Sequence, residues 1–274
     1  MILALILPIS CYAETAATPA TIQAQIAGAR CGDTIRLVGT FTAKIAVKAR
    51  PSCPVTLDLT SATATQFTFV GASNWIVSGG TFTGAPFVAM QVINSDHLSF
   101  LNGTYRNYGK VGIGLLDSTF IMIKGNDFSD ANADGVDLVS SQDVQFMNNS
   151  CSLTYSQTLH ADCLQMWNKP GDPMTVMRVV ADGNNCTGNM QCIDTFGSTD
   201  SRPLTDITIT NNRAYISTKW AGAINQPNAP CLRCSMHGNI AATHPGMPRS
   251  WERPGWYDGK TVAPGNVTGK WHDE

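Results

Sequence analysis

Short phrases that end in asparagine recur along the chain, and this repetition constrains the fold more than any other feature. Inside most phrases hydrophobic and polar residues alternate, and a Gly or Asn suited to a turn lies nearby. Regular spacing combined with two-residue alternation predicts a solenoid of short β-strands. The phrases end at Asn102, Asn126, Asn149, Asn184, Asn212 and Asn239, which are separated by 24, 23, 35, 28 and 27 residues.

Superposing the repeats predicts which residues lie level on successive coils. One apolar set is expected to face inward: Ile113, Val136, Leu164, Ile193 and Ile224. The next position is expected to face outward and reads Gly114, Asp137, Gln165, Asp194 and Asn225. Two residues before this column, a second outward column is expected at Gly112, Gly135, Cys163, Cys192 and Ala223. Amides and carboxylates beside small side chains predict the floor of a groove, because a solvated face would carry many Lys and Glu residues.

Composition excludes one class of partner. The chain has 274 residues, of which 43% are hydrophobic and 14% charged, so it can bury a large core as one domain. The formal net charge of -2 argues against nucleic-acid binding, which usually requires a basic stripe. Neutral or acidic small molecules and polymers remain as expected partners, and we expect a monomer.

The two ends of the chain differ from the repeats. Residues 1–13 are an apolar stretch that ends on a small residue, which predicts a secretory signal, and they are too short for a transmembrane helix. The protein is therefore expected to be secreted or periplasmic. Residues 14–66 are expected to form an N-terminal cap, with a helix over 18–29, and the first coils. Residues 67–242 are expected to form the parallel coils, and 243–274 an irregular tail.

Eight cysteines remain after residue 13, and an even number in an exported chain predicts disulfides. Cys151 and Cys186 each lie two positions after a ladder asparagine, and Cys163 and Cys192 align one coil apart. Because neighbouring coils are about 4.8 Å apart, within disulfide reach, we expect the bridges Cys151–Cys186 and Cys163–Cys192. The other cysteines predict one bridge in the cap, Cys31–Cys53, and one pair left open between disulfide, redox and zinc roles, Cys231 and Cys234.

The asparagine ladder, the coil lengths, the stacked polar columns and the capped start resemble the right-handed single-stranded parallel β-helix of the pectate-lyase-like superfamily. The resemblance covers about residues 67–242 and implies an all-β fold with a helix-and-strand cap and an irregular C-terminal tail. It also implies a polysaccharide substrate in an outward groove, because most members act on carbohydrate chains. Asp134-Gly-Val-Asp137 is similar to the paired acids of tailspike endoglycosidases, which implies a third acid at Asp162 or Asp194.

The chemistry is expected at Asp134–Asp137 and in the later phrase His160–Gln165. Glycoside hydrolysis requires one protonated and one ionised carboxyl group, and clustered acids raise one another's pKa. Asp137 and Asp194 lie two coils apart in one column, about 9.6 Å at strand spacing, near the upper end for an inverting pair. The predicted catalytic residues are Asp137, Asp162, Asp194 and His160, the last as base, orienting group or substrate ligand.

Substrate contacts are predicted around these acids, and hydrolysis implies no cofactor. Trp167 is placed to stack on a pyranose ring. The other predicted substrate-binding residues are Asp134, Gln165, Lys169, Tyr155 and Asn225. The same side chains also have purely structural interpretations, as turn residues, as an amide stack or as packing under a loop.

Two other functions fit the sequence. A uronate lyase or C5 epimerase needs cations or Ca²⁺ and a base that removes the C5 proton. Carboxylates suited to Ca²⁺ would come from Asp134, Asp137, Asp162 and Asp194, and the base from His160, Tyr155, Lys169 or Lys219. The scarcity of Arg near the acids favours hydrolysis. The third interpretation is a non-catalytic glycan-binding or adhesin solenoid.

Overall fold

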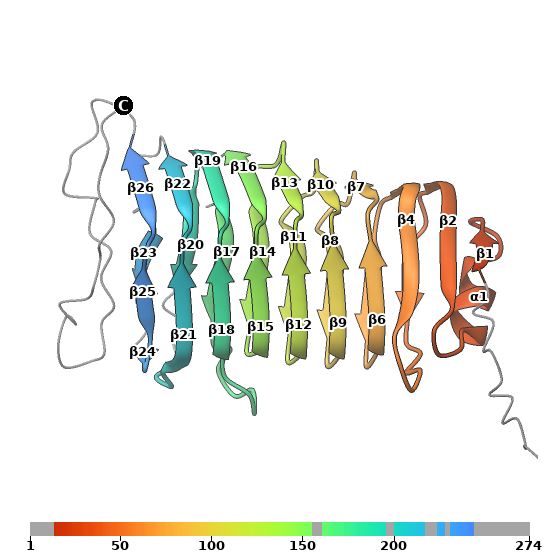
Figure 1. Cartoon of the computed structure of the whole chain (residues 1–274), viewed down its shortest axis with the longest axis horizontal. Helices are drawn as coiled ribbons and strands as arrows, with labels where there is room; N and C mark the ends of the chain where they lie inside the picture. Colours follow the sequence, from red (N-terminus) through yellow and green to blue (C-terminus); the bar gives the residue numbers. More distant parts are fainter. Residues whose placement is uncertain (1–13, 155–160, 196–199, 217–223, 228–230, 244–274) are drawn as a thin grey trace, which may run out of the picture.

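The chain winds into a solenoid of parallel β-strands (Figure 1). The computed structural model describes residues 14–154, 161–195, 200–216, 224–227 and 231–243. The expected signal and the expected tail lie outside these residues, apart from position 243.

The first coils contain β1 (Glu14–Ala17), α1 (Ile22–Gly28), β2 (Thr34–Phe41) and β4 (Val55–Ala64). The later coils repeat three strands. The first strands of these coils are β6 (Ser73–Ser78), β9 (Asp96–Leu101), β12 (Thr119–Lys124), β15 (Gln142–Met147), β18 (Met177–Asp182), β21 (Leu204–Thr210), β24 (Cys231–Leu232) and β25 (Ser235–His237). The second strands are β7 (Thr81–Thr83), β10 (Thr104–Arg106), β13 (Asp127–Ser129), β16 (Ser150–Thr154), β19 (Asn185–Asn189), β22 (Arg213–Ile216) and β26 (Ile240–Thr243). All of these strands belong to one 18-stranded sheet, the long sheet.

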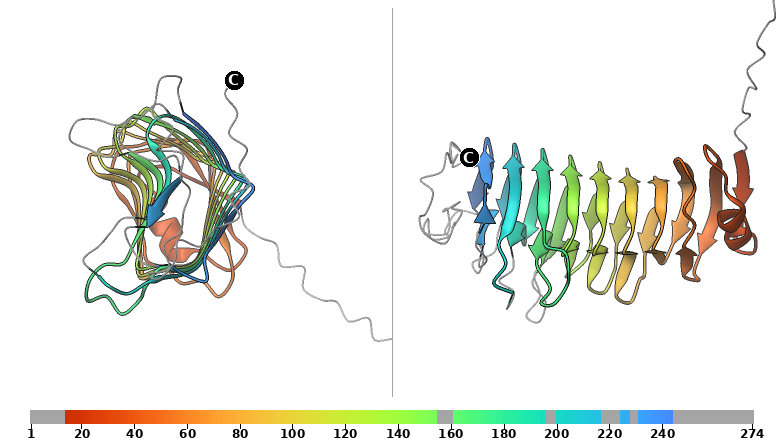
Figure 2. Two further views of the ribbon diagram at one scale, coloured as in Figure 1. Left: turned by 90° about the vertical axis from the view of Figure 1, so that its left-hand side faces the viewer. Right: turned by 90° about the horizontal axis from the view of Figure 1, so that it is seen from below.

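The third strands form a separate eight-stranded sheet. They are β3 (Ile45–Val47), β5 (Phe67–Val70), β8 (Val88–Ile93), β11 (Val111–Leu116), β14 (Asp134–Val139), β17 (Asp162–Trp167), β20 (Gln191–Thr195) and β23 (Ile224–Pro227). Each strand pairs in parallel with its equivalents on neighbouring coils, as β11 does with β8 and β14. Seen along the solenoid axis, the coils superpose and enclose the core (Figure 2).

The helix expected over 18–29 is present but shorter, since α1 covers Ile22–Gly28. Ile22 and Ile26 are buried and belong to the same hydrophobic cluster as the strands. In the axial view α1 lies within the outline of the coils (Figure 2). It therefore covers apolar surface that the first coil would otherwise expose.

The asparagine ladder is confirmed from Asn126 to Asn239. The Asn149 amide nitrogen donates to Asn184 Oδ1 and to the carbonyl of Ile123, both at 3.0 Å. Its Oδ1 accepts from the backbone and side-chain nitrogens of Asn126, at 2.9 and 3.1 Å. Because these buried amides satisfy one another and the backbone, they fix the register of successive coils.

The first asparagine of the series was assigned wrongly. Gly103 holds the ladder position on its coil, where its backbone nitrogen donates to Asn126 Oδ1 at 2.8 Å. Asn102 instead lies one residue earlier in a left-handed turn, with φ 56°. Gly125 and Asn148 have the same left-handed conformation on the next coils, with φ 69° and 52°. Both Gly and Asn tolerate this conformation, so the two positions are hard to distinguish in sequence.

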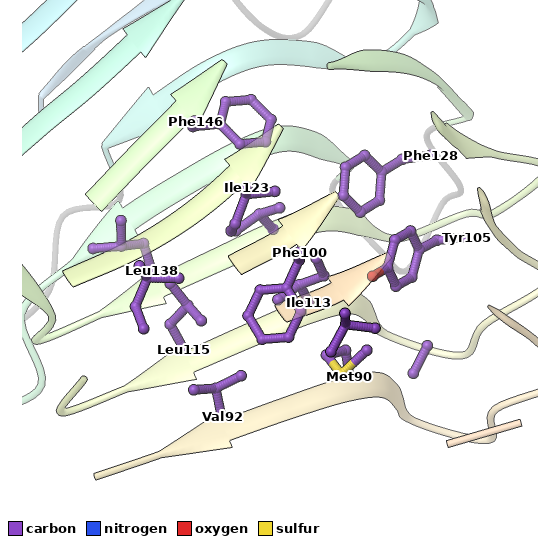
Figure 3. Packing of buried hydrophobic residues seen from close by; sticks show 14 of the residues in the cluster. Met90, Val92, Phe100, Tyr105, Ile113, Leu115, Ile123, Phe128, Leu138 and Phe146 are labelled. Atoms are coloured by element: carbon purple, nitrogen blue, oxygen red, sulfur yellow. The ribbon is translucent and has the colours of Figure 1, made fainter. Parts of the chain in front are cut away.

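Stacked side chains fill the interior. The rings of Phe82, Tyr105 and Phe128 lie on three successive coils with centroids 4.7 and 4.9 Å apart. Figure 3 shows Tyr105 and Phe128 beside each other at one side of the aliphatic core. Parallel pairing at strand spacing places equivalent side chains in direct contact, so the core is a set of columns.

Two of the expected disulfides are wrong. Cys151 does pair with Cys186 in the strand register, and Cys163 is level with Cys192. However, all four side chains point into the core, where each meets a cysteine on another wall of the solenoid. The bridges are therefore Cys151–Cys163 and Cys186–Cys192, with Cα separations of 5.7 and 5.4 Å.

The other two bridges join Cys31 to Cys53, as expected, and Cys231 to Cys234. Four disulfides are typical of proteins that mature outside the cytoplasm. Within the described ranges no helix has the length and hydrophobicity needed to cross a membrane.

Candidate functional site

The strands β14, β17 and β20 place acidic side chains next to one another on the outer side of the eight-stranded sheet. Asp137 pairs with Gln165, and Gln165 pairs with Asp194, so these residues form one column as the sequence predicted. At strand spacing, Asp137 and Asp194 are about 9.6 Å apart at the backbone. The expected continuation to Asn225 is not shown, because the register between β20 and β23 shifts after Ile224. The side chain of Asn225 lies outside the described residues.

The column of small residues predicted to face outward faces the core instead. A Cβ atom on Gly112 would lie 2.7 Å from the Gly135 carbonyl oxygen and 2.8 Å from the Phe128 ring. Cys163 and Cys192 are fully buried. Ile113 is buried too, so two consecutive residues of β11 face inward and strict alternation is broken. The groove floor predicted from these small residues is therefore wrong, and Ala223 lies outside the described part of the chain.

The break in alternation creates a second acidic column. Asp134 is level with Asp162, whose backbone nitrogen donates to Asp134 Oδ1 at 2.8 Å. The Gln165 side-chain nitrogen donates to Asp162 Oδ2 at 2.7 Å. Asp134, Asp137 and Asp162 therefore form one cluster across two coils, and Gln165 is held by the acid beside it.

Burial and mutual repulsion hold protons on this cluster. Burial, together with the charges of Asp137 and Asp162, raises the pKa of Asp134 to about 10. Burial likewise raises the pKa of Asp137 to about 7, while the hydrogen bond from Asp134 lowers it and the charge of Asp162 raises it. The hydrogen-bonded pair Asp134–Asp137 titrates as a unit, so near neutral pH at least one of its oxygens carries a proton.

The accessible side of the cluster is at Asp137. Asp137 lines a cleft of about 220 Å³ together with Gln91, Gly114, Trp167 and Lys169; we call it the Asp137 cleft. The cleft extends over β8, β11, β14 and β17, toward the N-terminal coils. Asp162 and Asp194 are 0% and 3% exposed, so these two acids are buried beside the cleft instead of lining it.

Lys169 supplies the positive charge of the Asp137 cleft. Lys169 Nζ forms an ion pair with Asp172 Oδ1 at 3.1 Å, and the side chain of Lys169 remains about half exposed. Burial raises the pKa of Asp117 nearby, the charge of Asp172 raises it further, and Lys169 lowers it. The cleft thus contains both a carboxyl group and a cation, with Trp167 among the lining residues.

Sequence reasoning missed Tyr108, which precedes β11. Tyr108 is 4% exposed, and its hydroxyl is buried without a hydrogen-bond partner among the described residues. Burial raises the pKa of Tyr108 well above its usual value, and the charges of Asp134, Asp127 and Asp137 raise it further. The phenol therefore stays protonated beside the acidic cluster. Its position in the repeat could have identified Tyr108 in the sequence. Backbone hydrogen bonds of adjoining residues make Ala85 and Ala131 its equivalents on the neighbouring coils, so a tyrosine stands where those coils have alanine.

Several predicted residues are not tested by the structure. His160 and Tyr155 fall in 155–160, and Lys219 falls in 217–223, all outside the described residues. Within the described ranges, no group of three or more His, Cys, Asp or Glu side chains is placed to hold a metal ion. The Ca²⁺ site considered from sequence at Asp134, Asp137, Asp162 and Asp194 stays a prediction.

Comparison with solved structures shows which fold this is. The chain superposes on a double mutant of the tailspike protein of E. coli bacteriophage HK620 with a TM-score of 0.59 and 11% identity, covering 80% of this chain and 46% of the tailspike. It superposes on a pectate lyase of a Bacillus species, in complex with trigalacturonate, with a TM-score of 0.52 and 13% identity, over 94% and 88% of the two chains. The chain has the single-stranded right-handed β-helix fold.

The β-helix is shared with proteins of different activity. PfbA, a surface adhesin of Streptococcus pneumoniae, superposes with a TM-score of 0.50 and 12% identity, over 78% of this chain and 75% of the adhesin. The present chain spans less than half the length of the tailspike that it matches. No protein-family model matches the chain, and no curated protein matches it in sequence. At these identities the similarity establishes the fold alone, so the reaction must be argued from the side chains.

Proposed function

We propose that the β-helix is a polysaccharide-cleaving enzyme that hydrolyses glycosidic bonds in the Asp137 cleft. The observation that carries this proposal is a protonatable carboxyl group on an accessible cleft, paired with a second carboxyl that raises its proton affinity. A general acid is most effective when its pKa lies near the working pH. Burial raises the pKa of Asp137 to about 7, so this side chain suits protonation of a leaving glycosidic oxygen.

The second carboxyl group required for hydrolysis is left unassigned among the residues that line the cleft. Asp194 lies in the same column as Asp137, about 9.6 Å away at the backbone, but it is 3% exposed and buried beside the cleft. Asp162 acts as a positioning residue, because it binds Gln165 and raises the pKa of Asp137. Trp167 contributes an aromatic face against which the apolar side of a sugar ring packs.

Lys169 supports a second candidate on the same site. A cation in the Asp137 cleft would bind the carboxylate of a uronate, and β-elimination or epimerisation requires that the carboxylate be neutralised. Lys169 already forms an ion pair with Asp172, which partly neutralises its charge. No other Lys or Arg lines this cleft among the described residues. Hydrolysis is therefore our first assignment.

One assay separates these reactions. Polysaccharides are incubated with the protein, and reducing ends are measured together with the ultraviolet absorbance of unsaturated uronate. Reducing ends without absorbance support hydrolysis, absorbance identifies a lyase, and binding without either product identifies a glycan-binding protein. Asp137→Asn should abolish turnover with an unchanged circular dichroism spectrum. Asp58→Asn on β4, which removes a carboxylate far from the cleft, should leave turnover intact; loss in both variants or in neither rejects the assigned site.

A further inference from the structure

A second groove lies on the long sheet, separate from the Asp137 cleft. It has a volume of about 470 Å³ and runs across β6, β9, β12, β15 and β18. Figure 1 shows these five strands side by side. At strand spacing the groove is about 19 Å long. We call it the long-sheet groove, and its lining does not include the acidic cluster.

One wall of the long-sheet groove is built from residues in the left-handed conformation. The second residue of each of the five strands that the groove crosses has this conformation: Asn74, His97, Phe120, Asp143 and Arg178. Asn and Asp tolerate this conformation, whereas a bulky aromatic residue is strained in it. Phe120 has φ 55° and is 52% exposed, so it has both an unfavourable backbone and an unfavourable contact with water. Strain of this kind is typical of binding sites.

His97 and Phe120 form a single aromatic surface. Their ring centroids are 4.7 Å apart and their planes are inclined by 23°. His97 Nδ1 is hydrogen-bonded to Asp96 Oδ1 at 2.7 Å, and Arg50 Nη2 donates to Asp96 Oδ2 at 2.6 Å. This network fixes the His97 ring against Phe120, so the surface is organised before any ligand binds.

The polar groups beside this surface carry no net charge. Arg178 donates to both carboxylate oxygens of Asp143, at 2.6 and 2.7 Å, and to Gln142 Oε1 at 3.0 Å. Gln145 and Ser99 add an amide and a hydroxyl to the lining. A paired Asp and Arg offer hydrogen bonds without attracting either an anion or a cation, so charge complementarity favours a neutral ligand rich in hydroxyl groups.

We propose that the long-sheet groove binds a chain of neutral pyranose sugars, with one ring stacked on Phe120 and His97. The apolar face of a pyranose packs on an aromatic surface, and its hydroxyls bond to planar amide, carboxylate and guanidinium groups. A groove of about 470 Å³ lies within the range of small-molecule sites. This site does not depend on the chemistry at Asp137 and would hold the polymer away from the reacting bond.

The test measures binding in an Asp137→Asn background, so that no probe is consumed. Cellohexaose, mannohexaose and xylohexaose serve as neutral probes, and an oligogalacturonate serves as the acidic probe, in titration calorimetry. Phe120→Asn is the informative variant, because Asn occupies the equivalent place at Asn74 and relieves the backbone strain. Tyr215→Asn is the matched control, an exposed aromatic residue on β22 that does not line the groove.

We expect Phe120→Asn to weaken binding of a neutral probe about fivefold to tenfold, and Tyr215→Asn to leave it unchanged. Binding of no neutral probe, unchanged binding in Phe120→Asn, or equal loss in both variants overturns the proposal. Sedimentation of the wild type is a further check, because a dimer that dissociates in Phe120→Asn would assign the groove to a second copy and also overturn it. If the protein cleaves no glycan but binds a neutral probe in a Phe120-dependent way, the long-sheet groove is supported and the proposed hydrolase activity is rejected. Failure of one proposal is therefore distinguishable from failure of the other.

Discussion

Replacing Asp137 with Asn should increase the stability of the protein while removing its activity. Burial raises the pKa of Asp137 from 3.8 to about 7. Between these two pH values the folded state holds a proton that the unfolded chain releases, so stability falls as the pH rises through this window. At about 1.4 kcal/mol per pKa unit, the ionised side chain costs up to about 4 kcal/mol above pH 7. Asn cannot ionise, and its Oδ1 can still accept the proton of Asp134.

The measurement is urea unfolding followed by circular dichroism at pH 4 and pH 8, with the disulfides intact. At pH 8 we expect the free energy of unfolding of Asp137→Asn to exceed that of the wild type by about 2 to 4 kcal/mol. At pH 4 the two proteins should be nearly equal, because folded Asp137 is then protonated.

Asp58→Asn supplies a control of opposite sign. The hydroxyl of Thr60 and the guanidinium of Arg36 lower the pKa of Asp58, although burial opposes them. The ionised form therefore contributes stability above the usual Asp pKa, and this contribution is lost as the pH falls. Asp58→Asn should be slightly less stable than the wild type at pH 8. An Asp137→Asn protein that is less stable at pH 8, or whose difference is the same at both pH values, would refute the proposed electrostatics.

Four further outcomes follow from the structure. Turnover should decline as the pH rises through about 7, measured as kcat/KM, because Asp137 loses the proton required of a general acid; a flat alkaline limb contradicts this. Asn149→Leu should lower the free energy of unfolding by about 3 to 5 kcal/mol in urea, because it breaks four buried hydrogen bonds, whereas exposed Gln145→Leu should change it little. Tyr108→Phe should leave the thermal stability unchanged, because the deleted hydroxyl has no partner among the described residues; a clear loss of stability contradicts this. Mass spectrometry of a non-reducing digest should find the peptides of Cys151 and Cys163 joined, and a Cys151–Cys186 peptide would reject the assigned connectivity.

The register was predictable because two independent patterns agree on it. The buried asparagines specify which residues of successive coils are level, and the inward apolar residues specify which face of each strand is buried. Together they were sufficient to place Asp137, Gln165 and Asp194 in one column. The error at Asn102 shifted the predicted alignment of the coil of β9 and β10 by one residue. It did not affect the later coils, since each coil is held by hydrogen bonds to its neighbours.

The face of the strand from which a side chain projects was less predictable than the residues with which it is level on neighbouring coils. Gly112 and Ile113 both face inward, so alternation within β11 gives the wrong side for one of them. The same break turns Cys163 toward Cys151, and it explains why a correct alignment led to incorrect disulfides. The spacing of the repeats shows which cysteines lie level on neighbouring coils, and both connectivities are within disulfide reach. It does not show which other wall of its own coil a cysteine side chain approaches.

The cleft itself could not be predicted, because it depends on side-chain size on coils that carry no acid. Gly114 follows Gln91 and precedes Asp137 in the same column, and its lack of a side chain leaves open space beside Asp137. The sequence suggested a groove centred on Asp137, His160, Asp162, Gln165 and Asp194; the structure buries Asp162 and Asp194, and His160 lies outside the described residues. The accessible site is therefore displaced toward the N-terminal coils.

The two core disulfides lie on the coils that carry the buried acids. Cys163 directly follows Asp162, and Cys192 precedes Asp194 by two residues. A bridge that closes a loop of about 12 residues contributes on the order of 3 kcal/mol, comparable with the cost of keeping one buried carboxylate ionised. Cys151–Cys163 ties β17 across the core to β16 of the same coil, so it fixes the wall from which Asp162 projects. The repulsion between Asp162 and the acids of β14 acts between two coils, and it is opposed by the backbone pairing of β14 with β17.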